Sequence, residues 1–268
     1  MKVILLTYSD DRFGRKDGKY SETQNYIDSL LKKLEFPIIH KKLTFNDISN
    51  NEFIIKNKDY FNSSMDYNGR AFKPFIIKNE LQSLEHDDIL IYNDCSPEIW
   101  NSNTIHSQIQ FIKKNSHIKV IGTLLDQNNN IILCYCPAPN HTHHHYTLDI
   151  CIKTMDAEKY RHSLMPGSGL IFIRKRENTL NLIDEWLHYN MIPECASLGI
   201  HNEYWNNECS KKQGHRHDQS IISILLCKYN YKLLLPNNFP IKNQLWNFIN
   251  YIQLNHNYQF IDPNTHKF

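Results

Sequence analysis

The chain has 268 residues, with 30 lysines and arginines, 28 aspartates and glutamates, and a formal net charge of +2. This length suits one large α/β domain or two small ones, and the near-neutral charge argues against a dedicated nucleic-acid-binding protein. Seven cysteines, no export signal and no apolar run of roughly 18 residues predict free thiols, no transmembrane segment and a cytoplasmic location.

A short apolar run opens the chain and predicts a buried strand over residues 2–8. A basic polar loop follows, over residues 9–20. The loop after the first parallel strand of an α/β sheet is a usual place to hold a nucleotide, although a solvated basic turn fits the sequence equally well. The nucleotide contacts that we expect here are Thr7, Tyr8, Ser9 and Arg15.

The next stretch predicts a helix and a strand before a weakly patterned region. Residues 21–24 have the spacing of a capping box, and the apolar residues from 26 to 34 form one helical face. Residues 36–40 predict a second strand. The polar, Asn-rich stretch over residues 44–68 is expected to cover the edge of the sheet.

Lys73 is expected at the start of a helix, because Pro74 suits the first helical position. Apolar residues at helical spacing continue to residue 84. The N-terminus of a helix attracts anions, so Lys73 is a candidate phosphate contact; a solvated lysine is the commoner alternative.

The segment over residues 87–96 contains the most informative pattern in the chain. Four apolar residues follow two aspartates and predict a short buried strand over residues 89–92, with Asp94 just beyond its carboxyl end. Ligands of open α/β sheets bind at this edge, and a carboxylate there can hold a divalent cation that in turn binds a diphosphate. We therefore assign Asp94 to a metal site and Tyr92 and Asn93 to donor binding; the resemblance described below adds Ser96 to the metal site.

The middle of the chain predicts a helix at 106–114 and strands at 118–121 and 131–135. Cysteines and histidines then gather over residues 134–145. Their spacing differs from that of C-x₂-C zinc frameworks, so a polar loop with two buried thiols is favoured over a zinc-binding interaction module.

The second half predicts a short helix at 156–161, a strand at 170–173 and a helix at 178–190. Glycines before the strand, Gly169 among them, allow close approach of a ligand to the backbone, or simply form a tight turn. The loop over residues 191–214 is expected to form a lid or an acceptor surface. A last strand is predicted at 231–235, and a last helix at 241–252.

The segment over residues 214–220 places polar side chains before an apolar helix, with Asp218 expected as its N-cap. Such groups at a helix N-terminus suit a diphosphate or a sugar hydroxyl, and the alternative is a capped helix with exposed histidines. The expected ligand contacts are His215 and Gln219.

Three stretches together resemble a family of GT-A-type glycosyltransferases. Residues 73–77 and 91–96 are similar to its WKPYII and LLYLDAG segments, and residues 166–175 with 185–187 resemble its Q-x-x-A-G-x-I-x-x-x-K and EWL segments. Residues 215–221 are similar to its HRHDQS segment almost letter for letter. The resemblance covers most of the chain from residue 1 to about 235 and, with the abundance of Asn, Ile, Lys and Tyr, is compatible with a large DNA virus and its host cytoplasm.

The resemblance implies a single GT-A domain over residues 1–268: a Rossmann-like, mixed, mostly parallel sheet flanked by helices. It implies transfer of a sugar from a nucleotide donor, of the UDP-sugar class, to a glycan or other hydroxyl acceptor, with Mn²⁺ or Mg²⁺. Asp94 falls on the first Asp of the family's DxD motif, and Asp218 with His217 is expected at the catalytic position. Ser96 departs from the second carboxylate, which leaves a catalytically silent sugar-nucleotide-binding protein as the alternative.

Overall fold

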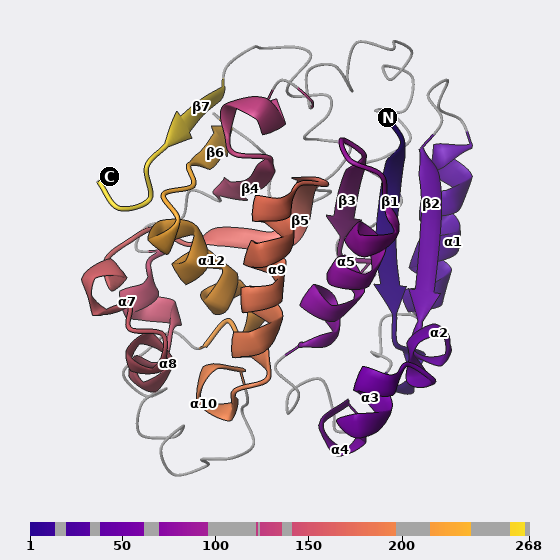
Figure 1. Ribbon diagram of the computed structural model, residues 1–268, viewed down its shortest axis with the longest axis horizontal. Coiled ribbons are helices and arrows are strands. Elements are labelled where there is room, and N and C mark those ends of the chain that lie inside the picture. Colours follow the sequence, from indigo (N-terminus) through magenta and orange to yellow (C-terminus); the bar gives the residue numbers. More distant parts are fainter. Residues whose placement is uncertain are drawn as a thin grey trace.

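The computed structural model describes residues 1–13, 20–32, 38–61, 70–95, 122, 124–135, 141–196, 215–236 and 258–265. Its described strands form one seven-stranded sheet in the order β2-β1-β3-β5-β4-β6-β7, with helices on its faces (Figure 1). The protein is thus α/β with a mixed sheet, as expected. The segments predicted at 106–121 and 241–252 lie outside the described residues.

The first half of the sheet is parallel. β1 (Val3–Ser9) pairs with β2 (Ile39–Thr44) on one side and with β3 (Ile89–Asn93) on the other, both in parallel. Every residue of β1 and β3 is buried, which explains why each is a nearly continuous apolar run rather than an alternating one.

The second half of the sheet contains the reversed strands. β5 (Pro166–Arg174) is antiparallel to both β3 and β4 (Ile131–Tyr135). β6 (Leu233–Pro236) is parallel to β4, and β7 (Tyr258–Ile261) is antiparallel to β6. Five of the described strands therefore run in one direction, and β5 and β7 run against them.

Within the described parts of the chain, four long helices cover the sheet. α5 (Phe72–Ser83), α9 (Glu177–Asn190) and α12 (Asp218–Lys228) lie in front of the sheet in Figure 1, and α1 (Tyr20–Leu31) lies behind β2. The shorter helices are α2 (Phe45–Ser49), α3 (Glu52–Lys56), α4 (Lys58–Phe61), α7 (His143–Tyr146), α8 (Asp149–Thr154), α10 (Pro193–Ala196), and the 3-10 turns Asp11–Phe13 and Glu158–Tyr160.

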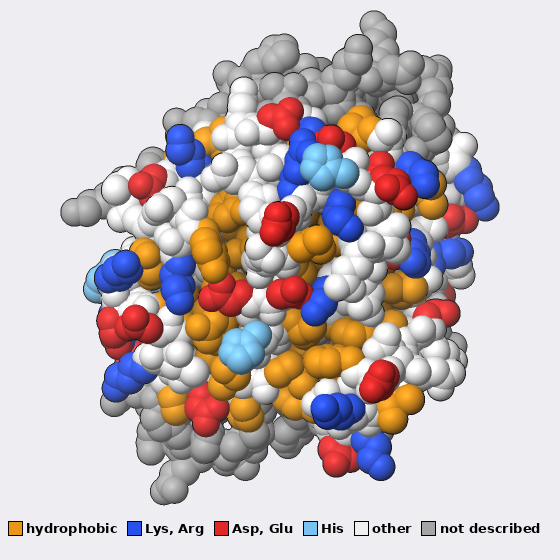
Figure 2. Space-filling view, in the orientation of Figure 1, with side chains coloured by type: hydrophobic (Ala, Val, Ile, Leu, Met, Phe, Trp, Pro, Cys, Tyr) orange, Lys and Arg blue, Asp and Glu red, His pale blue; other side chains and the backbone are white. Residues whose placement is uncertain are grey.

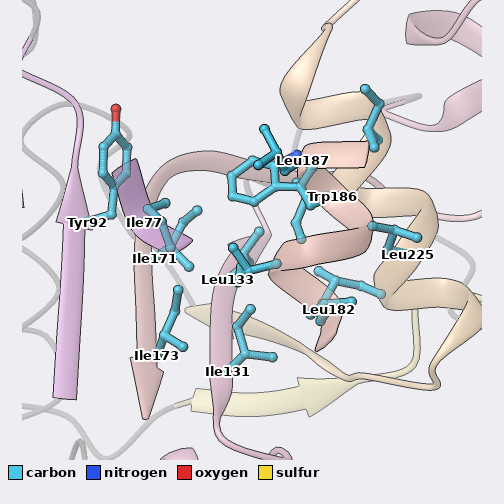
Figure 3. Close-up of a cluster of buried hydrophobic side chains, with 14 of the residues drawn as sticks. Ile77, Tyr92, Ile131, Leu133, Ile171, Ile173, Leu182, Trp186, Leu187 and Leu225 are labelled. Atoms are coloured by element: carbon cyan, nitrogen blue, oxygen red, sulfur yellow. The ribbon is translucent and has the colours of Figure 1, made fainter. Parts of the chain in front are cut away.

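The main core lies between the sheet and the three front helices. Figure 3 shows Ile131, Leu133, Ile171 and Ile173 of the sheet facing the side chains of α9, with Leu225 of α12 beyond them. Trp186 of α9 is completely buried at the centre. Burial of one such large side chain contributes about 1.5–3 kcal/mol, so this layer holds α9 and α12 firmly on the sheet.

Several predicted boundaries are wrong by a few residues. α1 begins at Tyr20, so Ser21 and its neighbours lie inside the first turn instead of capping it. α5 begins at Phe72, which places Pro74 third in the helix, still within the turn whose N–H groups lack helical partners. The N-cap of α12 is His217, and Asp218 is the first helical residue.

Three other segments also differ from their predictions. β2 begins at Ile39 rather than 36, and α9 begins at Glu177 with Arg176 as N-cap. The weakly patterned stretch after residue 44 contains α2, α3 and α4. β5 begins at Pro166 rather than 170, because Pro166 pairs with Tyr135 of β4 and the Asp94 amide donates to the Gly169 carbonyl just beyond β3.

Among the described helices, none combines the length and hydropathy needed to cross a bilayer. On the described part of the face in Figure 2, acidic and basic side chains are interspersed, with hydrophobic side chains between them.

Candidate functional site

The ends of five described elements meet at one edge of the sheet. β1 and β3 are parallel and finish there, and the antiparallel β5 starts there. α5 and α12 begin at the same edge, since their first turns supply contacts to these strands. This is the carboxyl edge of the parallel strands, where α/β sheets bind their ligands.

A buried lysine lies at the centre of this edge. Lys73, in the first turn of α5, is 1% exposed. Its Nζ lies 2.8 Å from Asp218 Oδ2 and 3.3 Å from Asp94 Oδ1. It also donates to Ser168 Oγ and to the Ser168 carbonyl, each at 3.2 Å. We call Lys73, Asp94, Ser168 and Asp218 the lysine cluster.

Lys73 contacts protein oxygens, and not the phosphate that we expected from the sequence. An ammonium group has three protons, and four protein oxygens already surround this one. The side chain is fully buried between two carboxylates, so it is not free to bind a phosphate.

Two aromatic side chains donate hydrogen bonds to the acidic residues of the cluster, Tyr92 to a carboxylate and Trp186 to a backbone carbonyl. The Tyr92 hydroxyl donates to Asp94 Oδ1 at 2.8 Å, and the Lys73 Nζ lies 5.2 Å from the centre of the Tyr92 ring. Burial and the nearby Asp94 carboxylate raise the pKa of Tyr92 well above its usual value, so the hydroxyl stays a neutral donor. On the other side, Trp186 Nε1 donates to the Asp218 carbonyl at 2.9 Å.

The cluster contains one positive and two negative side chains, which leaves an excess negative charge at the edge of the sheet. Asp94 is 29% exposed, whereas Asp218 is buried. Asp218 Oδ1 and Asn93 Oδ1 are both buried, and neither has a hydrogen-bond partner among the described residues. Buried acceptors without donors are costly, so this arrangement suits a ligand that supplies hydroxyl groups or positive charge.

The segment from His215 to Gln219 forms a strained turn before α12. His217 has φ 46° and ψ −118°, and the Gln219 amide donates to the Arg216 carbonyl at 2.9 Å. These values match the first central position of a type II′ turn, which favours glycine. The Gln219 side chain donates to the Pro166 carbonyl at 2.8 Å and ties the turn to β5.

The two histidines of this turn contact α10 through their rings. His217 Nδ1 lies 3.0 Å from the Ala196 carbonyl, and His215 Nε2 lies 2.7 Å from the Cys195 carbonyl. Burial, with nearby positive charge, lowers the pKa of His217 to about 4 and that of His215 to about 3. These ring contacts link the turn to α10 and support its conformation.

The expected nucleotide contacts of β1 have mostly internal partners. Thr7 is fully buried, and its hydroxyl bonds with His40 and Gln24. The Tyr8 hydroxyl donates to Asp10 at 3.0 Å, and the Tyr8 ring stacks on another aromatic ring. The Ser9 hydroxyl donates to Asp11 at 3.2 Å, and Arg15 lies outside the described residues.

Three residues of the site were not found by sequence reasoning. Ser168 and Trp186 contact Asp218 directly, and Arg12 forms a doubly bonded ion pair with the buried Asp10 beside β1. Ser168 lies within the segment 166–175 that resembles a glycosyltransferase motif, but its contact with Asp218 could not be predicted from the sequence, because that contact depends on the reversal of β5.

The residues that could hold a metal fit a hard cation through oxygen. Asp94 offers a partly exposed carboxylate with the ligand chemistry of Mg²⁺ or Mn²⁺, and its expected companion Ser96 lies outside the described residues. Within the described parts of the chain, no three His, Cys, Asp or Glu side chains gather as a metal site. His143, from the suggested zinc cluster, bonds with Thr147 instead, and Cys136 lies outside the described residues.

Comparison of the chain with protein-family models, with curated proteins and with solved structures found no match.

Proposed function

We propose that this protein is a metal-assisted glycosyltransferase that moves a sugar from a nucleotide-diphosphate donor, of the UDP-sugar class, to a glycan or other hydroxyl acceptor. One observation supports this most: the buried Lys73 joins Asp94 and Asp218 at the carboxyl edge of the sheet. The resemblance of residues 73–77, 91–96 and 215–221 to glycosyltransferase motifs points to the same side chains. We also propose that residues 1–268 form a single GT-A domain.

The chemistry requires charge control at two places. The bond between the sugar's anomeric carbon and the diphosphate breaks, while an acceptor hydroxyl oxygen bonds to that carbon and gives its proton to a base, for which Asp218 is the candidate. The departing diphosphate carries negative charge, which a Mn²⁺ or Mg²⁺ ion held by Asp94 would neutralise. Asp218 Oδ1, buried and without a described partner, suits a hydroxyl of the sugar or of the acceptor.

The location that we propose is cytoplasmic. The four cysteines whose side chains are described, Cys95, Cys151, Cys195 and Cys227, are all free thiols and all buried. Free thiols are typical of proteins from reducing compartments.

The test is a panel of nucleotide-sugars screened by thermal shift with Mn²⁺ and then with a chelator. A donor that binds the folded state raises the melting temperature, by an amount that grows with its concentration relative to Kd. We expect one nucleotide class to stabilise the protein more strongly with Mn²⁺. No shift with any donor, and no donor hydrolysis, would contradict the proposal.

A second candidate function is a catalytically silent protein that binds a sugar nucleotide. The burial of Asp218 favours it, because 1% side-chain exposure leaves a bulky acceptor little access to this carboxylate. Measured nucleotide-sugar binding without hydrolysis or transfer supports this candidate, whereas turnover with any acceptor eliminates it.

A further inference from the structure

The Ser168 hydroxyl contacts both Lys73 and Asp218 of the lysine cluster. Ser168 is 5% exposed, near the start of β5, opposite the end of β3. Its hydroxyl lies 2.9 Å from Asp218 Oδ2 and 3.2 Å from Lys73 Nζ. β5 places it there because the Gly169 carbonyl accepts from the Asp94 amide and fixes the strand at this point.

The direction of these hydrogen bonds follows from the chemistry of the groups. An ammonium group can only donate, so Lys73 donates to the Ser168 oxygen, and the single hydroxyl proton goes to Asp218. Asp218 Oδ2 therefore receives two donors, Lys73 at 2.8 Å and Ser168 at 2.9 Å. Asp218 Oδ1 receives none from the described residues.

Other contacts fix the backbone around this carboxylate. Trp186 Nε1 holds the Asp218 carbonyl, and the Gln219 side chain holds the Pro166 carbonyl at the start of β5. With the backbone held, the two donors on Oδ2 determine the rotation of the carboxylate. Oδ1 is left as the oxygen that can accept a proton or a hydroxyl from a ligand.

We propose that Ser168 is a positioning residue: together with Lys73 it orients the Asp218 carboxylate and leaves the buried Oδ1 as the oxygen that accepts from a ligand hydroxyl. This inference rests on the proposed function, since it assigns Ser168 a role in glycosyl transfer. Ser168 acts through Asp218 and is not itself the group that touches the reacting atoms.

The kinetic test compares Ser168→Ala with Ser163→Ala. Ser163 is a matched control, because it is 4% exposed and its hydroxyl donates to Asn264 at 2.8 Å, away from the cluster. We expect Ser168→Ala to lower kcat about tenfold while the donor KM stays within about twofold, and Ser163→Ala to leave both unchanged. An unchanged kcat in Ser168→Ala, or an equal loss in both variants, overturns the inference.

A second measurement needs no substrate and so separates this inference from the proposed function. The Ser168 cycle compares the melting temperatures of the parent protein, Ser168→Ala, Asp218→Asn and the double variant. The control cycle is the same comparison with Ser163→Ala in place of Ser168→Ala. Non-additive shifts in the Ser168 cycle and additive shifts in the control show that Ser168 and Asp218 act as a unit, even if no donor is turned over. Additive shifts in both cycles overturn the inference, even if glycosyl transfer is found.

Discussion

At the scale of single residues, the main feature is a buried ammonium group between two carboxylates. Lys73 is 2% exposed in its side chain, so its charge depends on Asp94 and Asp218 rather than on water. Two acids around one base leave the cluster with excess negative charge, which a ligand or a cation can share. Replacing a residue of this buried cluster is therefore expected to change both the stability of the fold and the binding of a ligand.

Replacing Lys73 with methionine should destabilise the fold strongly. Lys73→Met leaves Asp218 buried without its cation, and breaking a buried ion pair costs about 3–5 kcal/mol. Lys78→Met is the control on the same helix, because Lys78 is 29% exposed and pairs with Asp184 at 2.7 Å. A partly exposed pair contributes about 0–1 kcal/mol.

The measurement is the free energy of unfolding in urea. Adding Asp218→Asn to Lys73→Met removes one of the stranded carboxylates, so the double variant should be more stable than Lys73→Met alone. If Lys73→Met and Lys78→Met lose equal amounts of unfolding free energy, the buried ion pair stabilises the fold no more than the partly exposed one, which would contradict this prediction.

His217 holds its backbone in a conformation that favours glycine. Because His217→Gly and His217→Ala both remove the ring, the difference between them reports the backbone alone. We expect the Gly variant to be more stable by about 1 kcal/mol or more, as a strained residue costs about 1–3 kcal/mol. Thermal or urea unfolding of both proteins measures this difference.

The control pair is His188→Gly and His188→Ala in α9, where the backbone is helical and the side chain exposed. There the order should reverse, with Ala more stable by about 1 kcal/mol. The same order at both positions would mean that the turn at His217 is not strained.

The sequence named three members of the lysine cluster but not the way they interact. Asp94 was found because an apolar run ends just before it, and Asp218 because it precedes an apolar helix. Lys73 was expected to meet a phosphate, since the sequence does not show that two acids approach it. The contacts of Ser168 could not be predicted, because they depend on the antiparallel direction of β5, which an apolar pattern does not reveal.

At the scale of elements, α7 and the turn before α12 form a buried histidine region. His143 is fully buried, and its Nε2 has no partner within the described part of the chain. Burial, with the charges of His141 and His215, lowers the pKa of His143 to about 3. The α7–α12 junction also depends on backbone contacts, including the Arg216 amide with the Tyr146 carbonyl.

This region predicts a loss of stability in mild acid. The unfolded chain protonates His143 near its ordinary pKa of about 6.5, whereas the folded protein does so only near 3. Between these values the unfolded state binds more protons, so stability falls as the pH falls, by up to about 1.4 kcal/mol per pH unit for this residue. The decrease begins below about pH 6.5.

Unfolding free energies measured from pH 7 to pH 4 test this prediction. His143→Gln should reduce the slope of unfolding free energy against pH by up to about 1.4 kcal/mol per pH unit, because the unfolded variant no longer binds a proton at this position. The same substitution at the exposed His144 is the control. An identical slope in the parent protein and in His143→Gln would contradict the assignment.

The positions of the elements were predicted better than their limits. β3 and β4 were expected almost as observed, because a continuous apolar run has clear ends. The start of α5 predicted from Pro74 is wrong by two residues, and the start of α12 predicted from Asp218 is wrong by one. Both residue types are tolerated at several positions of a first helical turn, so neither fixes the exact start.

At the scale of the whole molecule, the sheet explains why distant parts of the sequence meet. β1 and β3 are parallel, so residues following each of them reach the same edge, and the reversed β5 returns its first residues to that edge. The α/β class and the parallel first half follow from the sequence pattern. The place of β5 between β3 and β4 does not, because apolar periodicity contains no information on strand order.

The central claim is that Asp94 of the lysine cluster holds the metal ion that would neutralise the diphosphate end of a sugar donor. The most direct measurement is donor turnover and nucleotide affinity, with Mn²⁺ present, in Asp94→Asn and in Asp149→Asn. Asp149 is a matched control, because it is 31% exposed, close to the 29% of Asp94, and forms an ion pair with Arg161. We predict that Asp94→Asn lowers turnover about 100-fold or more and that Asp149→Asn leaves it unchanged; equal turnover and nucleotide affinity in the parent protein and Asp94→Asn would contradict the account.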